Sequence, residues 1–305
     1  MKLNIIKNSR IWFSLSGTLL LLSLIFMILS FIKFSSPVKL GLDFTGGSKI
    51  EYSFSLDKMS NKNVSSESVA NLLSSIGLQS SNVQVAPQKD SIELILRTKA
   101  VSDDPLLDKF NQLLESNYGA FTVNSIDTVS PIIGPELFSS GVTSLIITIL
   151  GIVIYISTRF TRDYAFSAII ALIHDVFIAM GLFAFLGLFF GIEIDSLFIT
   201  ALLTIFGFSV HDTIVVFDRI RENQKLQSKN FDFRAVTEHS IEQVFKRSLN
   251  TSITVLTVLA ILFFFGGTST TLFSGALFFG LLIGTYSSLF IASPILVRFR
   301  EKNFS

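Results

Sequence analysis

Residues Ala165–Phe190 read AFSAIIALIHDVFIAMGLFAFLGLFF, a run in which Asp175 is the one acidic or basic side chain besides a neighbouring histidine. A helix that crosses the hydrocarbon core of a bilayer needs about 20 mostly apolar residues, so this stretch predicts a transmembrane helix. Five further blocks of the same kind lie at 11–32, 137–158, 196–217, 248–265 and 271–297. The sequence therefore predicts a multi-pass α-helical membrane protein with six transmembrane helices.

The composition of the 305-residue chain agrees with a membrane location. Half of the residues are hydrophobic and 15% are charged, whereas a soluble domain carries about a quarter charged residues. The 24 basic and 23 acidic residues leave a net charge of +1, which gives no reason to expect a nucleic-acid partner. There is no cysteine and there are three scattered histidines, so we expect no disulfide, no metal site and no bound cofactor.

The positions of lysine and arginine predict the orientation. With the amino terminus in the cytoplasm, the cytoplasmic segments are 1–10, 159–164, 218–247 and 298–305. These segments hold 15 of the 24 basic residues, and the short loops on the other side, 191–195 and 266–270, hold none. Cytoplasmic loops carry the excess of lysine and arginine. We therefore predict that both termini are cytoplasmic, that 11–32 is an uncleaved span and that 33–136 is an extracytoplasmic domain.

The segment 33–136 alternates between strand and helix patterns. Apolar residues recur at every second position in 41–55, 83–87, 92–96 and 120–129, and at helical spacing in 65–76 and 105–116. Gly46-Gly47 marks a bulge or turn within the first strand. The order βαββαβ predicts an α+β ferredoxin-like sandwich. Because the segment has no catalytic triad and no metal-ligand spacing, a docking or clamp domain is favoured over an enzyme.

Two carboxylates lie inside predicted spans, Asp175 and Asp212, and each follows a histidine. A charged side chain near the bilayer centre costs about 2.5–3.5 kcal/mol on insertion scales, so such residues usually face the bundle and have a function. At 1.5 Å per residue, Asp175 lies roughly 16 Å and Asp212 roughly 8 Å from the cytoplasmic ends of their spans. This geometry allows a shared polar cluster. The alternative is that each carboxylate is a protonated or hydrogen-bonded packing residue.

Arg247 opens the fifth span, where two roles are open. It is either an anchor at the membrane interface or a partner for Asp212, because its long side chain can reach into the bundle. Arg219 follows Asp212 by seven positions and shares its helix face, but its place in the headgroup region favours an anchor. The segment 218–247 has mixed charge and helical spacing, which predicts an amphipathic connector on the cytoplasmic surface.

Several of these stretches resemble the SecD and SecF proteins. They are Gly41–Gly47 (GLDFTGG), Ala171–Val176 (ALIHDV), Gly207–Asn223 (GFSVHDTIVVFDRIREN), Arg247–Ser252 (RSLNTS) and Gly284–Ser288 (GTYSS). The resemblance covers nearly the whole chain, and the 17-residue stretch is similar to the fourth-span motif of the SecF family. The family-motif residues are Asp43, Phe44, Thr45, Gly46, Gly47, Asp218 and Arg219. One departure is His211, where many members of the family carry asparagine.

The resemblance implies a subunit of the SecDF complex, a half bundle of the RND superfamily that uses the proton-motive force to help export preproteins. By this resemblance Asp212 carries the proton and Arg247 is its charged partner, with His211 and Asp175 beside them, and protons are the coupling ion. The implied partners are SecD, the SecYEG translocon, SecA indirectly, YajC as a further candidate, unfolded preproteins and membrane lipids. The implied location is the bacterial inner (plasma) membrane, or the thylakoid membrane in a source that has one.

Two other classes of function compete with this interpretation. An intramembrane aspartyl protease also uses two membrane aspartates, but Ser209-Val210-His211-Asp212 differs from the Gly-x-Gly-Asp of such proteases. A proton-driven RND-type exporter of lipids or small molecules is the stronger alternative, although exporters usually carry both six-span halves in one chain. The P-loop spacing GxxxxGK[ST] is absent from the sequence, which favours a non-enzymatic, proton-coupled subunit.

Overall fold

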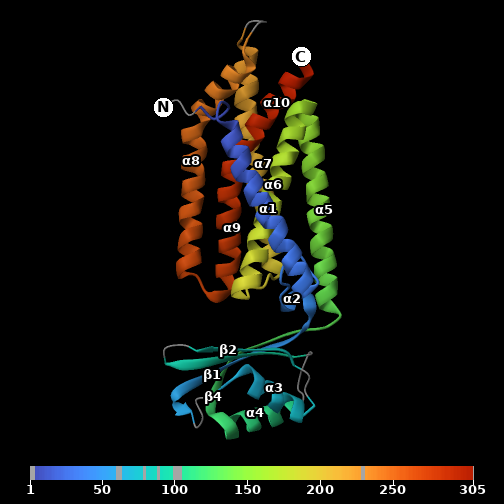
Figure 1. The fold of residues 1–305 in the computed structure, drawn as a ribbon, viewed down its shortest axis with the longest axis vertical. Helices are drawn as coiled ribbons and strands as arrows, with labels where there is room; N and C mark the ends of the chain where they lie inside the picture. Colours follow the sequence, from blue (N-terminus) through green and yellow to red (C-terminus); the bar gives the residue numbers. More distant parts are fainter. Residues whose placement is uncertain are drawn as a thin grey trace. The chain divides into compact units, whose positions relative to one another are not determined.

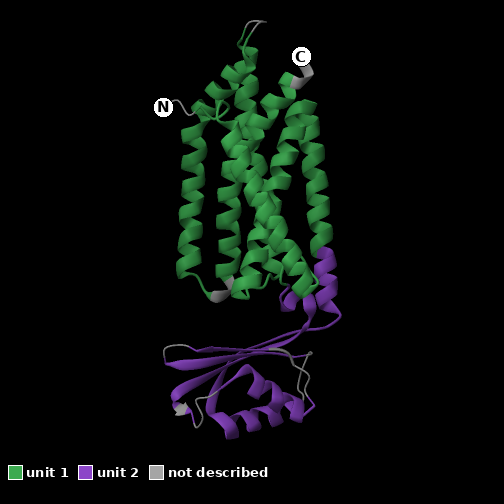
Figure 2. Ribbon diagram, viewed as in Figure 1, with its two compact units in different colours: residues 1–39, 141–305 green, residues 40–140 purple. Residues whose placement is uncertain are grey.

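The computed structural model describes residues 4–59, 64–77, 80–87, 90–98, 105–227 and 231–304. The chain divides into two compact units, a helical unit of Met1–Lys39 with Gly141–Ser305 and a sheet unit of Leu40–Ser140 (Figure 2). Six helices of the described chain are long and apolar enough to cross a membrane. The prediction of six transmembrane helices and one α+β domain is confirmed.

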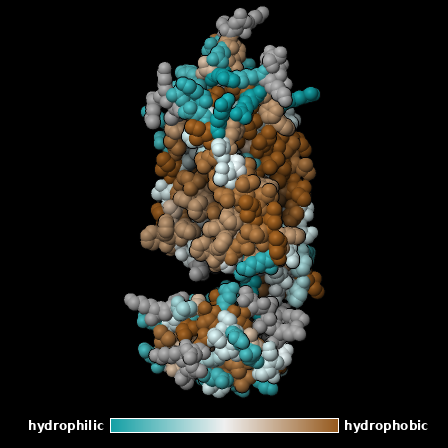
Figure 3. Space-filling model, in the orientation of Figure 1, coloured by the Kyte–Doolittle hydropathy of each residue, from teal (hydrophilic) through white to brown (hydrophobic). Residues whose placement is uncertain are grey.

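The helical unit contains one long helix for each predicted span (Figure 1). The helices are α1 (Ser9–Phe34), α5 (Ile133–Arg159), α6 (Arg162–Phe190), α7 (Ser196–Lys225), α8 (Phe233–Phe265) and α9 (Thr268–Ser287). A single π-helical turn, η1 (Ser288–Ala292), leads from α9 into α10 (Ser293–Phe304), which completes the sixth span. Hydrophobic side chains form a broad band around this unit, and hydrophilic ones gather at the end that carries both termini (Figure 3).

The segment 218–247 is helical over most of its described length, as its spacing predicts, because α7 and α8 both continue into it. Helix α7 ends at Lys225 and α8 begins at Phe233. The extensions keep a buried face, with Ile220, Ile241 and Val244 all less than a tenth exposed, so the two helices pack together beyond the apolar blocks. The expected tail 298–305 is likewise helical as far as Phe304.

Small side chains bring α1 against α6. Helix α1 buries Ser16, Ser23 and Ser30, which are seven residues apart, and leaves its leucines exposed. At the crossing, a Cβ atom added to Gly181 of α6 would lie 2.1 Å from Cβ of Ser23. Membrane helices commonly associate through such small residues, because these let the backbones approach closely, whereas large apolar side chains pack as well against lipid.

The sheet unit has the ferredoxin-like arrangement that the sequence predicts. Its elements are α2 (Leu42–Thr45), β1 (Gly47–Met59), α3 (Ser66–Ser75), β2 (Ser80–Pro87), β3 (Ser91–Thr98), α4 (Pro105–Tyr118) and β4 (Gly119–Val129). The strands lie in the order β2-β3-β1-β4, and all neighbouring pairs are antiparallel. Ile50, Tyr52, Leu94 and Phe110 belong to the core that the helices form with the sheet. The Tyr52 hydroxyl donates to Asn111 Oδ1 at 2.9 Å, and burial raises the pKa of this phenol.

The expectation of one strand over 41–55 is wrong in its first part. Leu42–Thr45 forms a helical turn, and β1 begins only at Gly47. Gly46 and Gly47 have φ angles of +68° and +115°, which side chains with a Cβ atom rarely adopt. A Cβ atom at Gly46 would lie 2.8 Å from Cα of Pro131, and one at Gly47 would lie 2.6 Å from the Thr98 carbonyl oxygen. The two glycines therefore let this turn pass close to neighbouring backbone.

Candidate functional site

Asp175 lies at the junction of three helices. Its side chain is completely buried, and Oδ2 accepts hydrogen bonds from Ser209 Oγ of α7 at 2.6 Å and from Ser287 Oγ of α9 at 2.7 Å. The close approach of α9 depends on Gly284, where an added Cβ atom would lie 3.2 Å from Cβ of Ser209 and 3.8 Å from Asp175 Oδ2. Asp175 is thus a hydrogen-bonded residue that joins α6, α7 and α9.

His174 forms a pair with Asp175. Its Nδ1 atom lies 2.9 Å from Asp175 Oδ1, and the histidine side chain is 4% exposed. Its other ring nitrogen, Nε2, is buried and has no hydrogen-bond partner among the described residues. When Nδ1 carries the proton and donates it to the carboxylate, Nε2 is a free basic nitrogen. His174 is not among the predicted site residues, and its position directly before Asp175 is the one sequence signal for this pair.

Asp212 lies on α7 and is 7% exposed. Its Oδ2 atom accepts a long hydrogen bond of 3.3 Å from Thr285 Oγ1 of α9, and Thr285 Oγ1 lies 2.8 Å from Ser252 Oγ of α8. Compared with Asp175, this carboxylate is held by fewer and longer contacts.

One turn of α9 contacts both carboxylates. Thr285, which donates to Asp212, is two positions before Ser287, which donates to Asp175. On α7, Ser209 is one helical turn before Asp212 and also donates to Asp175. The two acids therefore share the same turns of α7 and α9, although each accepts hydrogen bonds from different hydroxyl groups. We call Asp175, Asp212, Ser209, Thr285 and Ser287 the carboxylate–hydroxyl cluster.

His211 and Arg247 lie outside this cluster. His211 is exposed, on a face of α7 that the described helices leave uncovered. Arg247 is exposed as well and lines a cavity of about 390 Å³ with Val215 and Asp218. It therefore lies about one turn closer than Asp212 to the end of the helical unit that carries both termini. Within the described part of the chain Arg247 and Asp212 form no ion pair. At the level of Asp212, α8 presents Ser252, whose hydroxyl contacts Thr285.

The second half of the 17-residue stretch connects helices. Asp218 pairs with Arg159 at the end of α5 at 3.0 Å and with Arg221 at 3.2 Å. Arg219 donates to Gln243 of α8 at 2.7 Å and to Glu222 at 2.6 Å. Asp218 and Arg219 therefore connect α7 with α5 and α8 near the end that carries both termini. The role of Arg219 as an anchor at the membrane interface stays a prediction.

The GLDFTGG stretch belongs to the sheet unit and forms a structural turn there. Phe44 is buried, and its ring centroid lies 5.6 Å from that of Phe138. Thr45 Oγ1 donates to the Gly41 carbonyl at 3.0 Å. Asp43 lies in the first turn of α2. These contacts explain the turn without any role in binding or proton transfer.

Known families match most of the chain. Residues 109–302 match the family described as protein export membrane protein SecD/SecF, C-terminal, and residues 34–55 match the SecD/SecF GG motif family. The chain is 39% identical over 307 residues to the protein translocase subunit SecF of Synechocystis, with 99% of this chain and 95% of that protein covered. It is 40% identical over 280 residues to SecF of Thermobaculum terrenum, with 88% and 86% covered.

Longer proteins match over part of their length. The protein translocase subunit SecDF of Bacillus subtilis is 37% identical and matches 85% of this chain, but only 34% of its own length is covered. The crystal structure of SecDF, a translocon-associated membrane protein from Thermus thermophilus, superposes with a TM-score of 0.80 at 30% identity. That match covers 99% of this chain and 39% of the SecDF chain, so the present chain spans about two fifths of the solved protein.

Proposed function

Since this chain belongs to the SecD/SecF family of protein export membrane proteins, we propose that it is the SecF subunit of a protein translocase accessory complex. In this role it couples the proton-motive force to the export of unfolded preproteins. It acts as a transport subunit and not as an enzyme. The observation that carries the proposal is the loosely held Asp212 in the carboxylate–hydroxyl cluster, because an ionisable side chain in the membrane core is costly and usually marks a functional site.

Asp212 is the proton-carrying residue in this proposal. Asp212 accepts one long hydrogen bond from Thr285, whereas Asp175 accepts two short hydrogen bonds from serines. The contact of Asp212 therefore breaks and re-forms more easily than those of Asp175. One elementary charge that crosses 100 mV yields about 2.3 kcal/mol, which is enough to bias two helix arrangements. When Asp212 is ionised, a small movement of α8 brings the side chain of Arg247 one turn inward to neutralise it.

Asp175 and Asp212 then respond together. Ser209 and Ser287 connect Asp175 to the same turns of α7 and α9 that hold Asp212. A change at one carboxylate therefore moves the helix turns whose hydroxyl groups donate hydrogen bonds to the other. In this scheme His174 supplies a second basic group beside Asp175, while His211 faces outward and modulates the surroundings of Asp212.

The proposed partners follow from the length of the related proteins. Because the relatives named SecDF contain this chain as about one third to two fifths of their length, we infer that a separate SecD chain supplies the other half. The complex works with SecYEG, indirectly with SecA, and with YajC as a further candidate. Its place is the bacterial inner (plasma) membrane, or a thylakoid membrane in a source that has one, with both termini cytoplasmic.

The test is preprotein translocation into inverted membrane vesicles that contain or lack this chain together with its SecD partner. After SecA and ATP have started translocation, an imposed proton gradient should complete it only in vesicles with the chain. Gradient-independent translocation in both kinds of vesicle would refute the proposal. Purification with an outer-membrane duct in place of SecD and SecYEG would support a small-molecule exporter.

A further inference from the structure

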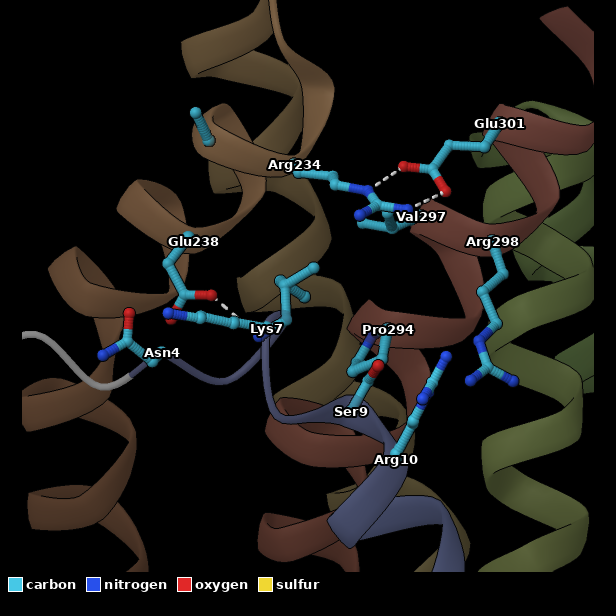
Figure 4. A pocket seen from close by; sticks show the side chains of 12 residues that line it. Asn4, Lys7, Ser9, Arg10, Arg234, Glu238, Pro294, Val297, Arg298 and Glu301 are labelled. Atoms are coloured by element: carbon cyan, nitrogen blue, oxygen red, sulfur yellow. Dashed lines mark hydrogen bonds and ion pairs between the residues drawn. The ribbon is translucent and has the colours of Figure 1, made fainter. Parts of the chain in front are cut away.

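A pocket of about 640 Å³ opens at the end of the helical unit that carries both chain termini (Figure 4). The start of the chain, α8 and α10 form its walls. The ionisable residues that line it are Lys7, Arg10, Arg234, Glu238, Arg298 and Glu301. Four of these are basic and two are acidic, so the pocket carries a formal charge of +2.

Both acidic side chains are already bound within the protein. Glu238 accepts hydrogen bonds from the backbone amides of Ile5 at 2.6 Å and Ile6 at 2.7 Å, which fixes the start of the chain on α8. Glu301 accepts two hydrogen bonds from Arg234, one of them from Nη2 to Oε2 at 2.6 Å (Figure 4). Glu301 is thus paired with Arg234, and Glu238 is turned toward the start of the chain, while the formal charge of the pocket stays at +2.

Three basic side chains form no ion pair with a described residue, and one of them, Arg298, interacts with Glu301 only at longer range. Lys7, Arg10 and Arg298 are exposed, and none of them forms an ion pair with another described residue. Arg298 is held in place by the ring of Phe13, whose centroid lies 4.3 Å from its guanidinium carbon. The first turn of α1, which contributes Arg10, contains no acidic residue. The pocket therefore offers a preformed positive site to an anion.

We propose that this pocket binds the phosphate of an anionic phospholipid headgroup. Arginine and lysine side chains are the usual donors to phosphate oxygens, and basic pockets between membrane helices on the cytoplasmic side suit lipid headgroups. The neighbouring surface of α1 supports a lipid as the source of the phosphate. Ile11 is 62% and Leu15 is 48% exposed directly beyond Arg10, which gives the acyl chains an apolar surface.

The chain contains a reporter for this site. Trp12 is its one tryptophan, and it lies two residues beyond Arg10, with its ring 4.5 Å from that of Phe290. Lipids with brominated acyl chains quench tryptophan fluorescence on contact. The experiment compares brominated phosphatidylglycerol with brominated phosphatidylcholine as quenchers of Trp12, using the full-length protein in mixed micelles.

The wild-type chain should be quenched by phosphatidylglycerol at a lower fraction of brominated lipid than by phosphatidylcholine. In the double variant Lys7→Gln/Arg10→Gln, the preference for phosphatidylglycerol over phosphatidylcholine should fall roughly tenfold, because each basic residue near the surface contributes to anionic-lipid binding. The matched control Lys225→Gln/Lys246→Gln removes two cations that do not line the pocket, and it should keep the preference.

Three results would overturn the proposal. They are equal quenching by the two lipids in the wild-type chain, an unchanged preference in Lys7→Gln/Arg10→Gln, and an equal loss in the control variant. An excess of inorganic phosphate should not displace the brominated lipid; displacement would assign the pocket to free phosphate. Neither Lys7 nor Arg10 makes an ion pair that the substitution would break, so the double variant should unfold at the wild-type temperature. Arg298→Gln provides a second, independent variant.

Discussion

The two intramembrane aspartates differ in how firmly the protein holds them. Asp175 accepts two short hydrogen bonds from Ser209 and Ser287 and pairs with His174. Asp212 accepts one long hydrogen bond from Thr285. A buried carboxylate with several donors is a fixed part of the structure, whereas one with a single weak donor can exchange partners. This contrast makes Asp175 the more firmly held carboxylate, and it supports our proposal that Asp212 carries the proton.

Substitution of Asp175 should therefore affect stability more than transport. In Asp175→Asn an NH₂ group replaces either Oδ2, the acceptor for both Ser209 and Ser287, or Oδ1, which faces His174 Nδ1. Either way a buried acceptor is lost, at about 1–3 kcal/mol. We expect a lower midpoint of thermal unfolding for the purified full-length chain, with a milder loss of export than Asp212→Asn causes. The control Asp218→Asn removes a partly exposed ion pair, which contributes about 0–1 kcal/mol. Equal midpoints for the two variants would contradict the structural role.

The Gly46-Gly47 turn gives a second prediction at the residue scale. In Gly47→Ala the new Cβ atom would lie 2.6 Å from the Thr98 carbonyl oxygen at a φ of +115°. We expect faster amide hydrogen exchange in β1 and β3, with a loss of roughly 2 kcal/mol or more in the sheet unit. Gly77→Ala is the matched control, since Gly77 has a φ of +80° but no atom within 4 Å of the added Cβ. Equal exchange in the two variants would mean that the close approach to Thr98 is unimportant.

At the scale of elements, α9 organises the centre of the bundle. Gly280 and Gly284 let it lie against α7, and its next turn presents Thr285 and Ser287 to the two carboxylates. The π-helical turn η1 begins at Ser288, immediately afterwards. Such turns are often found at functional sites in helices. The position of α9 therefore controls the geometry of the carboxylate–hydroxyl cluster.

Gly280→Ala should displace α9. The added Cβ atom would lie 2.2 Å from Cδ1 and 2.4 Å from Cγ1 of Ile205, a side chain that is 2% exposed and has little room to move. We expect a destabilisation of about 1–3 kcal/mol and reduced gradient-dependent export, because Thr285 moves away from Asp212. Gly151→Ala on α5 meets no atom within 4 Å and should unfold at or slightly above the wild-type temperature. A stable, fully active Gly280→Ala would show that close packing at this crossing is not required.

The sequence predicts the elements better than their ends and contacts. Hydropathy and length identify the six spans because a bilayer sets a fixed thickness, and alternating residues identify the strands. The ends of α7 and α8 are missed because these helices become amphipathic beyond the bilayer. The roles of Ser209, Thr285 and Ser287 could not be predicted, since hydroxyl residues are frequent in the spans and only helix rotation selects the ones that meet. The place of Arg247 also depends on where α8 lies along α7.

At the scale of the whole molecule, the orientation in the membrane is the main prediction. The chain has no cysteine, so single substitutions give a clean labelling background. Ser75→Cys in the sheet unit and Lys225→Cys at the end of α7 place a thiol at two exposed positions. An impermeant thiol reagent should label Ser75→Cys in intact cells and Lys225→Cys only after permeabilisation, because lysine and arginine favour the cytoplasmic side. The reverse pattern would overturn the orientation.

The central claim is that Asp212 carries the proton that drives export. Asp212→Asn keeps the shape of the side chain and an acceptor for Thr285 but cannot release a proton. In inverted vesicles with SecD and SecYEG, the measurement is the additional preprotein translocated after a pH gradient is imposed on SecA-initiated reactions. Asp212→Asn should insert normally and lose this gradient-dependent fraction, while Asp218→Asn, with its partly exposed carboxylate on the same helix, should keep it. A wild-type response to the gradient in Asp212→Asn would contradict the account.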